Sequence, residues 1–309
     1  VGVITIIAGG MRALRQHDLK LLLAMGTIGQ LGFMMVILGW GTRDAVTAGA
    51  VILLGHGAFK AALFMIVGVL DHQHGTRDLR ELPRLGRRWI VLLASTVASA
   101  GSMAGVPLLF GFIGKEADYE ALYDSGTGGR VTLAFVVIGS MLTAAYSVRF
   151  VLGAAGRLAE PATQADEGPR PAVTLIAPAA LLAAVTVVLG LVPALADGIA
   201  DTATVALAGG GEAVHLAIWH GLTVPLELSI LALVAGVAVG LAGDRLTPVL
   251  RRGEIVPSST EGYRQSLQAI NLVATRVTRV TQPGSLPIYL GVILVTAAAL
   301  PGVSLLAGE

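Results

Sequence analysis

The chain has 309 residues, of which 54% are hydrophobic and 13% are charged, and its formal net charge is +1. A soluble domain carries about 25% charged residues, so this composition excludes an ordinary soluble globular protein. The sequence contains no cysteine, which excludes disulfides, iron–sulfur clusters and thiolate-bound metals held by this chain.

Eight apolar segments recur along the chain with lengths suited to helices that cross a bilayer. They are Val1–Leu14, Leu19–Trp40, Ala45–Leu70, Trp89–Ile113, Val131–Leu152, Val173–Leu195, Leu222–Ala242 and Leu286–Leu306. Because unpaired backbone groups in lipid are costly and no strand-like alternation occurs, the sequence predicts an all-α, polytopic transmembrane helical bundle with about eight spans. The chain starts without Met inside an apolar run, so we expect its first helix to be truncated and the chain to be a fragment.

The charges of the connecting loops alternate along the chain. Arginines gather in Met11–His17, Asp71–Arg88 and Gly243–Gln282, whereas Gly41–Asp44, Glu116–Arg130 and Ala196–Gly221 are neutral or acidic overall. The positive-inside rule places the first three loops in the cytoplasm and the other three outside. This alternation independently supports eight crossings.

Two further stretches suggest an organisation into parts. Residues 157–171 are polar and rich in proline, which predicts a cytoplasmic linker between a first part, residues 1–156, and additional membrane helices in residues 172–309. Residues 260–282 place apolar and basic side chains on different faces, which predicts an amphipathic helix on the membrane surface or against a neighbouring protein of the same complex.

The three lysines of the chain all lie within apolar segments or at their ends, although the positive charges of the loops come from arginine. They are Lys20, Lys60 and Lys115. A charge inside the membrane costs about 2.5–3.5 kcal/mol on the insertion scale, so such residues usually mark a functional path. Arginine stays protonated in proteins, whereas a buried lysine can release its proton near neutral pH. The lysines are therefore candidates for an intramembrane proton relay.

Lys60 lies near the middle of its segment, and His56 precedes it by four residues on the same helix face. Both groups can exchange protons, so the pair fits a relay, although a structural polar pair that holds two helices together would have the same spacing. Lys20 begins its segment beside Asp18, and Asp18, like Glu116, is a candidate partner for the relay or for a cation. A lysine at a helix start also fits a side chain that snorkels to the membrane surface.

Lys115 follows a glycine-rich stretch that contains Pro107. Proline removes a helical hydrogen bond, and broken helices at membrane depth line cavities or ion paths. We therefore expect one discontinuous helix, with Lys115 and Glu116 next to the break. The alternative is that both residues simply mark the outer end of a helix.

The remaining polar residues give weaker signals. Glu227 follows Pro225 inside an apolar segment, where it would either bind a cation or lie near the outer surface. Tyr146 and Arg149 are interpreted as anchors at a helix end. No phosphate loop, dinucleotide fingerprint or zinc signature occurs, so we expect no cofactor and no metal site. Topology explains the basic residues, so nucleic-acid binding is not expected.

Three stretches carry a family resemblance: HDLKLLLAMGTIGQLGFMMV, HGAFKAALFMIVGVLDHQHGTRDLREL and PLLFGFIGKEADYEAL. They resemble the antiporter-like core shared by the large subunits of Mrp cation/proton antiporters and the distal proton-pumping subunit of respiratory complex I. The second half of the chain, including AIWHGLTVPLELSILAL, resembles the extended C-terminal region of the Mrp A subunit more closely.

The resemblance implies a function and a set of site residues. It implies a multi-pass subunit of a cell-membrane complex that exchanges Na+ for H+ together with other membrane subunits, a transporter and not an enzyme. The alternative is a proton-translocating subunit of a complex I-like NADH:quinone oxidoreductase. By resemblance, Lys20, His56 and Lys60 correspond to the half-channel and central relay, and Lys115 corresponds to the terminal lysine. The matching Glu and Lys of the other half-channel would precede Val1.

Overall fold

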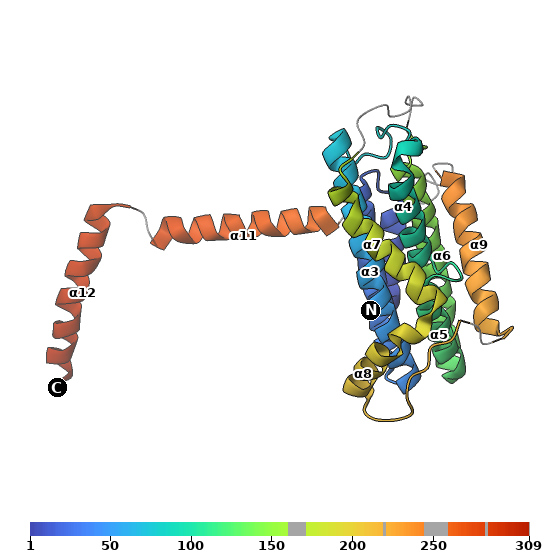
Figure 1. Cartoon of the computed structure of the whole chain (residues 1–309). Helices are drawn as coiled ribbons and strands as arrows, with labels where there is room; N and C mark the ends of the chain where they lie inside the picture. The colour runs from blue at the N-terminus through green and yellow to red at the C-terminus, as the bar shows by residue number, and fades with distance from the viewer. Residues whose placement is uncertain (160–170, 219–220, 244–258, 282–283, 309) are drawn as a thin grey trace. The chain divides into compact units, whose positions relative to one another are not determined.

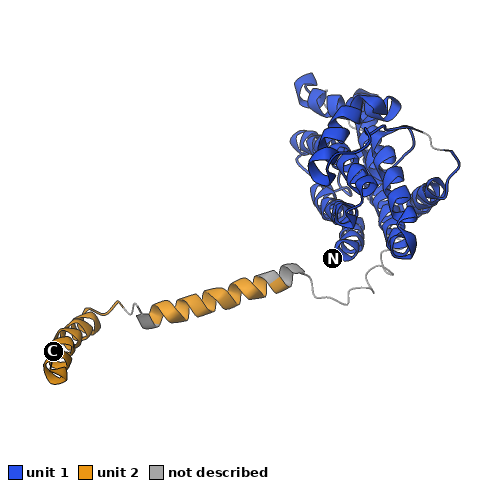
Figure 2. Cartoon of the chain, turned by 90° about the horizontal axis from the view of Figure 1, so that it is seen from below, with its two compact units in different colours: residues 1–248 blue, residues 249–309 orange. Residues whose placement is uncertain are grey.

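The computed structural model describes residues 1–159, 171–218, 221–243, 259–281 and 284–308. It divides into two compact units, residues 1–248 and 249–309 (Figure 2). All regular elements within the described ranges are helices, as predicted for an all-α membrane protein. Most of the predicted linker, residues 160–170, lies outside the described residues, so the boundary at residues 157–171 stays a prediction.

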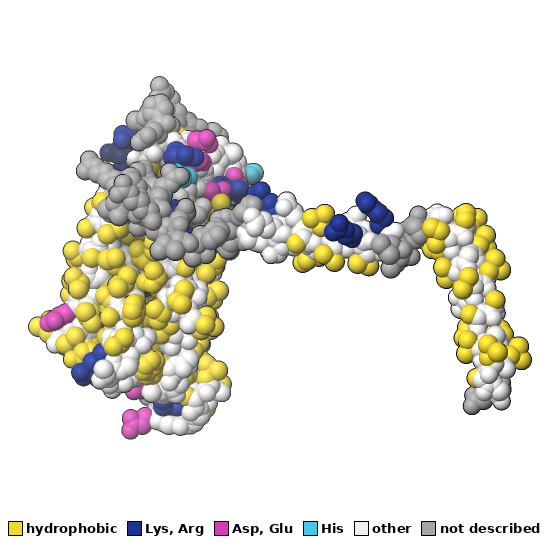
Figure 3. All heavy atoms as spheres, turned by 180° about the vertical axis from the view of Figure 1, so that it is seen from behind, with side chains coloured by type: hydrophobic (Ala, Val, Ile, Leu, Met, Phe, Trp, Pro, Cys, Tyr) yellow, Lys and Arg dark blue, Asp and Glu magenta, His cyan; other side chains and the backbone are white. Residues whose placement is uncertain are grey.

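The first unit is a bundle of long apolar helices (Figure 1). Its elements are α1 (Gly2–Leu14), α2 (Leu19–Trp40), α3 (Arg43–His74), η1 (Arg87–Trp89), α4 (Ile90–Ala104), α5 (Phe110–Asp124), α6 (Gly126–Ala154), α7 (Val173–Leu191), η2 (Pro193–Ala196), α8 (Asp197–Ala208) and α9 (Val224–Ala242). Helix α3 packs against α2, α4, α5, α7 and α8, while α6 packs against α1, α4 and α9. On the face seen in Figure 3, hydrophobic side chains cover the flank of this unit, and charged side chains gather toward its two ends.

Local signals in the sequence set the helix boundaries. The Asp18 carboxylate accepts hydrogen bonds from the backbone N–H groups of Lys20 and Leu21, which caps the start of α2. That helix ends at Gly41, whose φ of +81° suits a residue without a Cβ. Thr42 then caps α3. A turn of two residues therefore reverses the chain between two spanning helices.

Glycines bring the helices unusually close together. A Cβ added at Gly9 of α1 would lie 2.5 Å from the backbone nitrogen of Gly29 in α2. Membrane helices associate through small residues because lipid provides no hydrophobic force between them. The high glycine content of the sequence thus corresponds to direct backbone contact between α1 and α2.

The chain connections meet at the two ends of the bundle as the charge alternation predicts. At one end, Leu19 N–H donates to the Arg77 carbonyl at 3.0 Å, and Leu85 N–H donates to the Ala155 carbonyl at 3.3 Å. At the other end, the Arg43 guanidinium donates to the carbonyl oxygens of Gly209 and Glu212. The arginine-rich loop therefore lies at one end, and the loop after α8 lies at the other.

Six of the described helices have the length and hydropathy of a membrane span, namely α2, α3, α6, α7, α9 and α12 (Leu286–Ala307). The other two predicted spans differ from a simple helix. Helix α1 has 13 residues, and the segment predicted as Trp89–Ile113 forms α4 and α5 with a break between them. The structure thus confirms the polytopic helical fold and the discontinuous helix.

One predicted boundary is wrong. The sequence placed residues 116–130 in an outer connection, but α5 continues to Asp124 and α6 begins at Gly126. The reason is that α5 buries Tyr119 and Leu122 against its neighbours, so burial extends the helix through a stretch that looks polar in the sequence. The charged side chains of residues 116–124 therefore lie on a packed helix.

The second unit contains α11 (Ser259–Thr281) and α12. Helix α11 carries Leu267, Ile270, Val273 and Val277 at helical spacing, and these side chains are exposed. The stretch forms a helix, while its position on a membrane surface or against a neighbouring protein stays a prediction.

Candidate functional site: two buried lysines

Lys60 lies inside the bundle, with 5% of its surface exposed. Its Nζ donates a hydrogen bond to the Leu23 carbonyl of α2 at 3.1 Å and stands 5.8 Å from the centre of the Tyr146 ring of α6. A carbonyl oxygen and an aromatic face attract a positive charge but do not neutralise it. Lys60 is thus held by a carbonyl dipole from α2 and an aromatic face from α6, without a carboxylate among these contacts.

His56 occupies the same face of α3, one turn before Lys60, and the two side chains interact electrostatically. Its ring packs edge-on against Phe59 at 5.5 Å between centroids. The buried His56 Nδ1 has no hydrogen-bond partner among the described residues. An imidazole nitrogen that is free to accept or donate suits proton exchange with a neighbouring amine.

Tyr146 was interpreted from the sequence as an anchor at a helix end, and this interpretation is wrong. The side chain is buried, and its ring packs against Gly26, where a Cβ would come within 2.9 Å of the ring. Arg149, the second proposed anchor, is also buried and donates to the Gln16 carbonyl. The absence of a side chain at Gly26 lets the ring reach Lys60, a pairing between distant segments that sequence spacing cannot reveal.

The break between α4 and α5 has a strained backbone. Gly105 ends α4 with φ +89°, and Leu108 has φ +67°, a conformation that costs a residue with a Cβ about 1–2 kcal/mol. The start of α5 is held by a hydrogen bond of 3.0 Å from Gly111 N–H to the Ser102 hydroxyl. Strain of this kind persists where surrounding contacts over-determine the backbone, and it clusters at functional sites.

Lys115 crosses this break. Its Nζ donates to the carbonyl oxygens of Met103 and Ala104, each at 3.0 Å, at the C-terminal end of α4. The last carbonyls of a helix lack partners within the helix and carry partial negative charge, so they suit a cation. The side chain is 7% exposed. Lys115 therefore lies next to the break, as the sequence predicted.

Two carboxyl groups accompany Lys115 on α5. Glu116 is buried, which disfavours the alternative that it marks an outer helix end. Asp118, which the sequence placed in an outer loop, is 1% exposed and interacts electrostatically with Lys115. The spacing of three residues between Lys115 and Asp118 was a signal available in the sequence, but it has meaning only if α5 continues through both.

The remaining predicted residues lie at the ends of helices. Lys20 is exposed in the first turn of α2, as a snorkelling side chain would be. Asp18 caps that helix and forms an ion pair with Arg77 at 3.3 Å. Glu227 is exposed in the first turn of α9, where a negative charge stabilises a helix start.

The structure therefore brings together His56 and Lys60, and separately Lys115 and Glu116, but not Lys20 or Glu227. The hydrogen bonds of the two buried lysines go to different segments: Lys60 donates to α2, and Lys115 donates to the end of α4.

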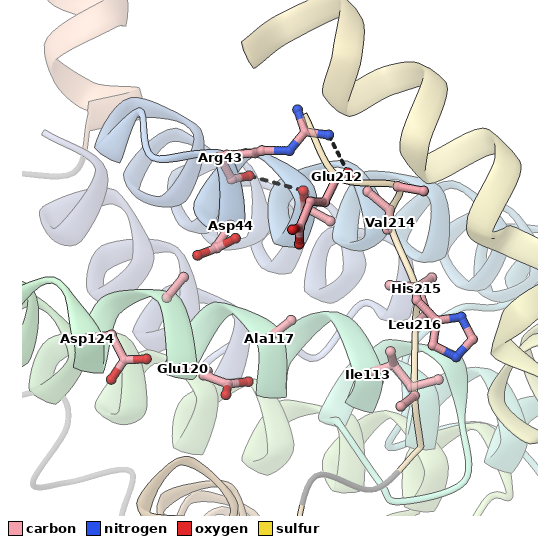
Figure 4. Close-up of a pocket in the computed structure, with 14 residues that line it drawn as sticks. Arg43, Asp44, Ile113, Ala117, Glu120, Asp124, Glu212, Val214, His215 and Leu216 are labelled. Carbon is pink, nitrogen blue, oxygen red and sulfur yellow. Dashed lines mark hydrogen bonds between the residues drawn. The ribbon is translucent and has the colours of Figure 1, made fainter. Parts of the chain in front are cut away.

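A cavity of about 530 Å³ opens beside α5 at the end of the bundle that carries Arg43. Figure 4 shows carboxylates from three segments around it, and most of its charged lining is acidic. The acidic lining residues are Asp44, Glu120, Asp124 and Glu212. Such a lining concentrates cations. The described part of the chain has no group of three or more His, Cys, Asp or Glu side chains arranged to hold a metal ion.

Comparisons with known proteins connect this arrangement to a family. The family described as "NADH:quinone oxidoreductase/Mrp antiporter, TM" matches residues 1–143, which contain both buried lysines and the break between α4 and α5. This part of the chain is similar to that family over its whole matched length. The residues that match the family model thus include α1 to α5 and most of α6.

Individual relatives extend the similarity beyond residue 143. The chain is 34% identical over 244 residues to the A/B subunit of a probable K(+)/H(+) antiporter of Rhizobium meliloti, covering 77% of this chain and 24% of the relative. It is 31% identical over 260 residues to the A1 subunit of a Na(+)/H(+) antiporter of Staphylococcus haemolyticus, covering 77% and 32%. The chain thus spans less than half the length of these curated relatives.

Solved structures agree with this assignment. The Mrp complex from Dietzia sp. DQ12-45-1b contains a chain with a TM-score of 0.78 and 32% identity, covering 99% of this chain and 33% of that one. Respiratory complex I from Thermus thermophilus contains a chain with a TM-score of 0.56 and 22% identity, covering 68% of this chain and 44% of that one. The second similarity shows a shared fold. These comparisons confirm two predictions from the sequence: the chain is a homologue of Mrp antiporter A subunits, and it is a multi-pass membrane protein.

Proposed function

We propose that this chain supplies the C-terminal part of the antiporter-like core of an Mrp A subunit, and the helices that follow it, in the cell membrane. We propose further that it moves protons in exchange for Na+ through a path that includes His56, Lys60 and Lys115. The observation that carries the proposal is the burial of Lys60 against a backbone carbonyl, with an unpaired His56 nitrogen one turn away. An opposite charge beside Lys60 would favour its charged form, and none of the contacts described above supplies one. Lys20, exposed at the start of α2, would exchange protons with water at the mouth of the path.

The Mrp assignment is favoured over a complex I subunit by the extent of the similarity. The Mrp structure matches 99% of the chain, whereas the complex I structure matches 68%. Names of the relatives include both Na+ and K+ as the exchanged cation. We propose that Na+ is the exchanged cation and that further membrane subunits are partners. Flux should also be measured with K+ in place of Na+.

The test separates charge from proton release. Lys60→Arg keeps a positive charge that does not dissociate, whereas Lys60→Met keeps the length of the side chain without a charge. If Lys60 carries protons, both variants lose most cation-dependent proton flux in everted vesicles that contain the complete complex. If Lys60 only supplies a fixed charge, Arg restores much of the flux that Met removes. Subunit content on native gels shows that the compared complexes are assembled.

Two other results would contradict the proposed function. Full flux in Lys60→Met would identify the lysine as a helix-packing element in a structural membrane scaffold. Loss of NADH-driven proton pumping on deletion of the gene, with sodium tolerance unchanged, would assign the chain to a redox-driven complex instead.

A further inference from the structure

Asp118 is a buried carboxyl group that the proposed path does not yet use. It lies on α5, it is 1% exposed, and both of its carboxylate oxygens lack a hydrogen-bond partner among the described residues. Burying a carboxylate without donors costs free energy, and such groups in a folded protein call for an explanation in terms of function. The basic residue that interacts with Asp118 electrostatically is Lys115.

Lys115 donates hydrogen bonds to α4, and a further acceptor, the Asp118 carboxylate, lies on its own helix. Its ammonium donates to Met103 and Ala104 across the break, which uses two of its three N–H groups. Side chains three residues apart are neighbours on the surface of a helix, so Asp118 stands one turn from Lys115 toward the C-terminal end of α5. Lysine has a long flexible stem with rotatable donors, which suits movement between these acceptors.

We propose that Asp118 accepts the proton that Lys115 releases and is therefore a further proton-transfer residue of this chain. In the step, an N–H bond of the Lys115 ammonium breaks and an O–H bond forms on the Asp118 carboxylate. The pair changes from ammonium and carboxylate to amine and carboxylic acid. Its net charge is zero before and after, so the transfer adds no net charge to the protein interior.

The position of Asp118 also gives the proton a route onward. Within two turns beyond it, α5 carries Glu120 and Asp124 to the acidic cavity, and water can exchange protons with carboxylates there (Figure 4). Neither Lys115 nor Asp118 lines this cavity itself. Asp118 therefore stands along α5 between the lysine at the break and the carboxylates that reach open space.

This inference rests on the proposed function, and the test keeps the two separate. Cation-dependent proton flux is measured in everted vesicles with the complete complex carrying Asp118→Asn, Asp118→Glu, Asp118→Gln or Lys115→Arg. We expect Asp118→Asn to lower flux at least about tenfold and Asp118→Glu to keep several-fold more flux than Asp118→Gln. Glu and Gln have nearly the same size, so any steric damage is common to both and their difference reports titration.

Equal flux in the Glu and Gln variants, whether high or low, would overturn the role of Asp118. If Lys115→Arg is inactive while Asp118→Asn is fully active, the lysine path stands and only Asp118 is excluded. If Lys115→Arg is fully active, Lys115 does not release protons, and this part of the proposed function is wrong.

The matched control is Asp71→Asn at the end of α3, where the carboxylate is exposed and pairs with Arg77 at 3.6 Å. It should keep full flux, because such surface pairs contribute about 0–1 kcal/mol.

Discussion

Lys115 and Met103 lie on opposite sides of the break between α4 and α5, and the Lys115 Nζ donates a hydrogen bond to the Met103 carbonyl at 3.0 Å. This bond satisfies a helix-end carbonyl that has no partner within α4. The geometry of the break therefore sets the position of the charged group. A change in the backbone at the break should move Lys115 even when the lysine itself is unaltered.

Gly111→Ala tests this coupling between the break and the lysine. A Cβ at Gly111 would collide with the Ser102 carbonyl, so α4 and α5 must separate, at a cost of about 1–3 kcal/mol. We expect a lower thermal stability of the detergent-solubilised complex and a loss of flux. Gly68→Ala is the matched control, because it adds the same methyl group where no atom lies within 4 Å. Equal melting of the two variants would contradict the close contact.

Tyr146 provides a second test, which addresses the environment of Lys60. Tyr146→Phe keeps the aromatic face near the ammonium, whereas Tyr146→Leu removes it. A cation–π contact contributes about 0.5–2 kcal/mol, so flux in Tyr146→Leu should fall about 2- to 30-fold below that in Tyr146→Phe. The measurement is initial proton flux per assembled complex. Indistinguishable rates would mean that the ring only fills space.

Topology can be tested directly because the chain has no native cysteine. Arg84→Cys and Gly210→Cys introduce thiols at exposed positions at opposite ends of the bundle. An impermeant maleimide should label position 210 in intact cells and position 84 in everted vesicles, since the arginine-rich loop is predicted to be cytoplasmic. Labelling of both positions from one side would refute the predicted arrangement.

The loop that contains Asp78 gives a pH-dependent prediction. A side-chain hydrogen bond from Arg80 holds the pKa of Asp78 below its usual value. A lowered pKa in the folded state means that the contact stabilises the loop at neutral pH and is lost as the pH falls through that pKa. Asp78→Asn should imitate the acid state at pH 7. Trypsin added to everted vesicles should then cleave after Arg80 several-fold faster, and an unchanged rate would count against the contact.

The sequence by itself determined the membrane fold and the main candidates. Long apolar runs have one stable solution in lipid, because a helix satisfies its own backbone hydrogen bonds. The same reasoning singled out Lys60 and Lys115, since a lysine in an apolar segment is costly wherever its neighbours lie. Pro107 and the nearby glycines predicted the break because they act locally on the backbone.

Only the tertiary structure decided which groups surround these lysines. Tyr146 reaches Lys60 from a helix more than 80 residues away in the sequence, and Gly26 gives it room to do so. Asp118 resembles a residue of a polar outer loop until the packing of Tyr119 and Leu122 extends α5 through it. Burial and contacts between helices depend on how several segments pack at once. Local composition carries no record of that packing, so these two neighbours could be found only in the folded chain.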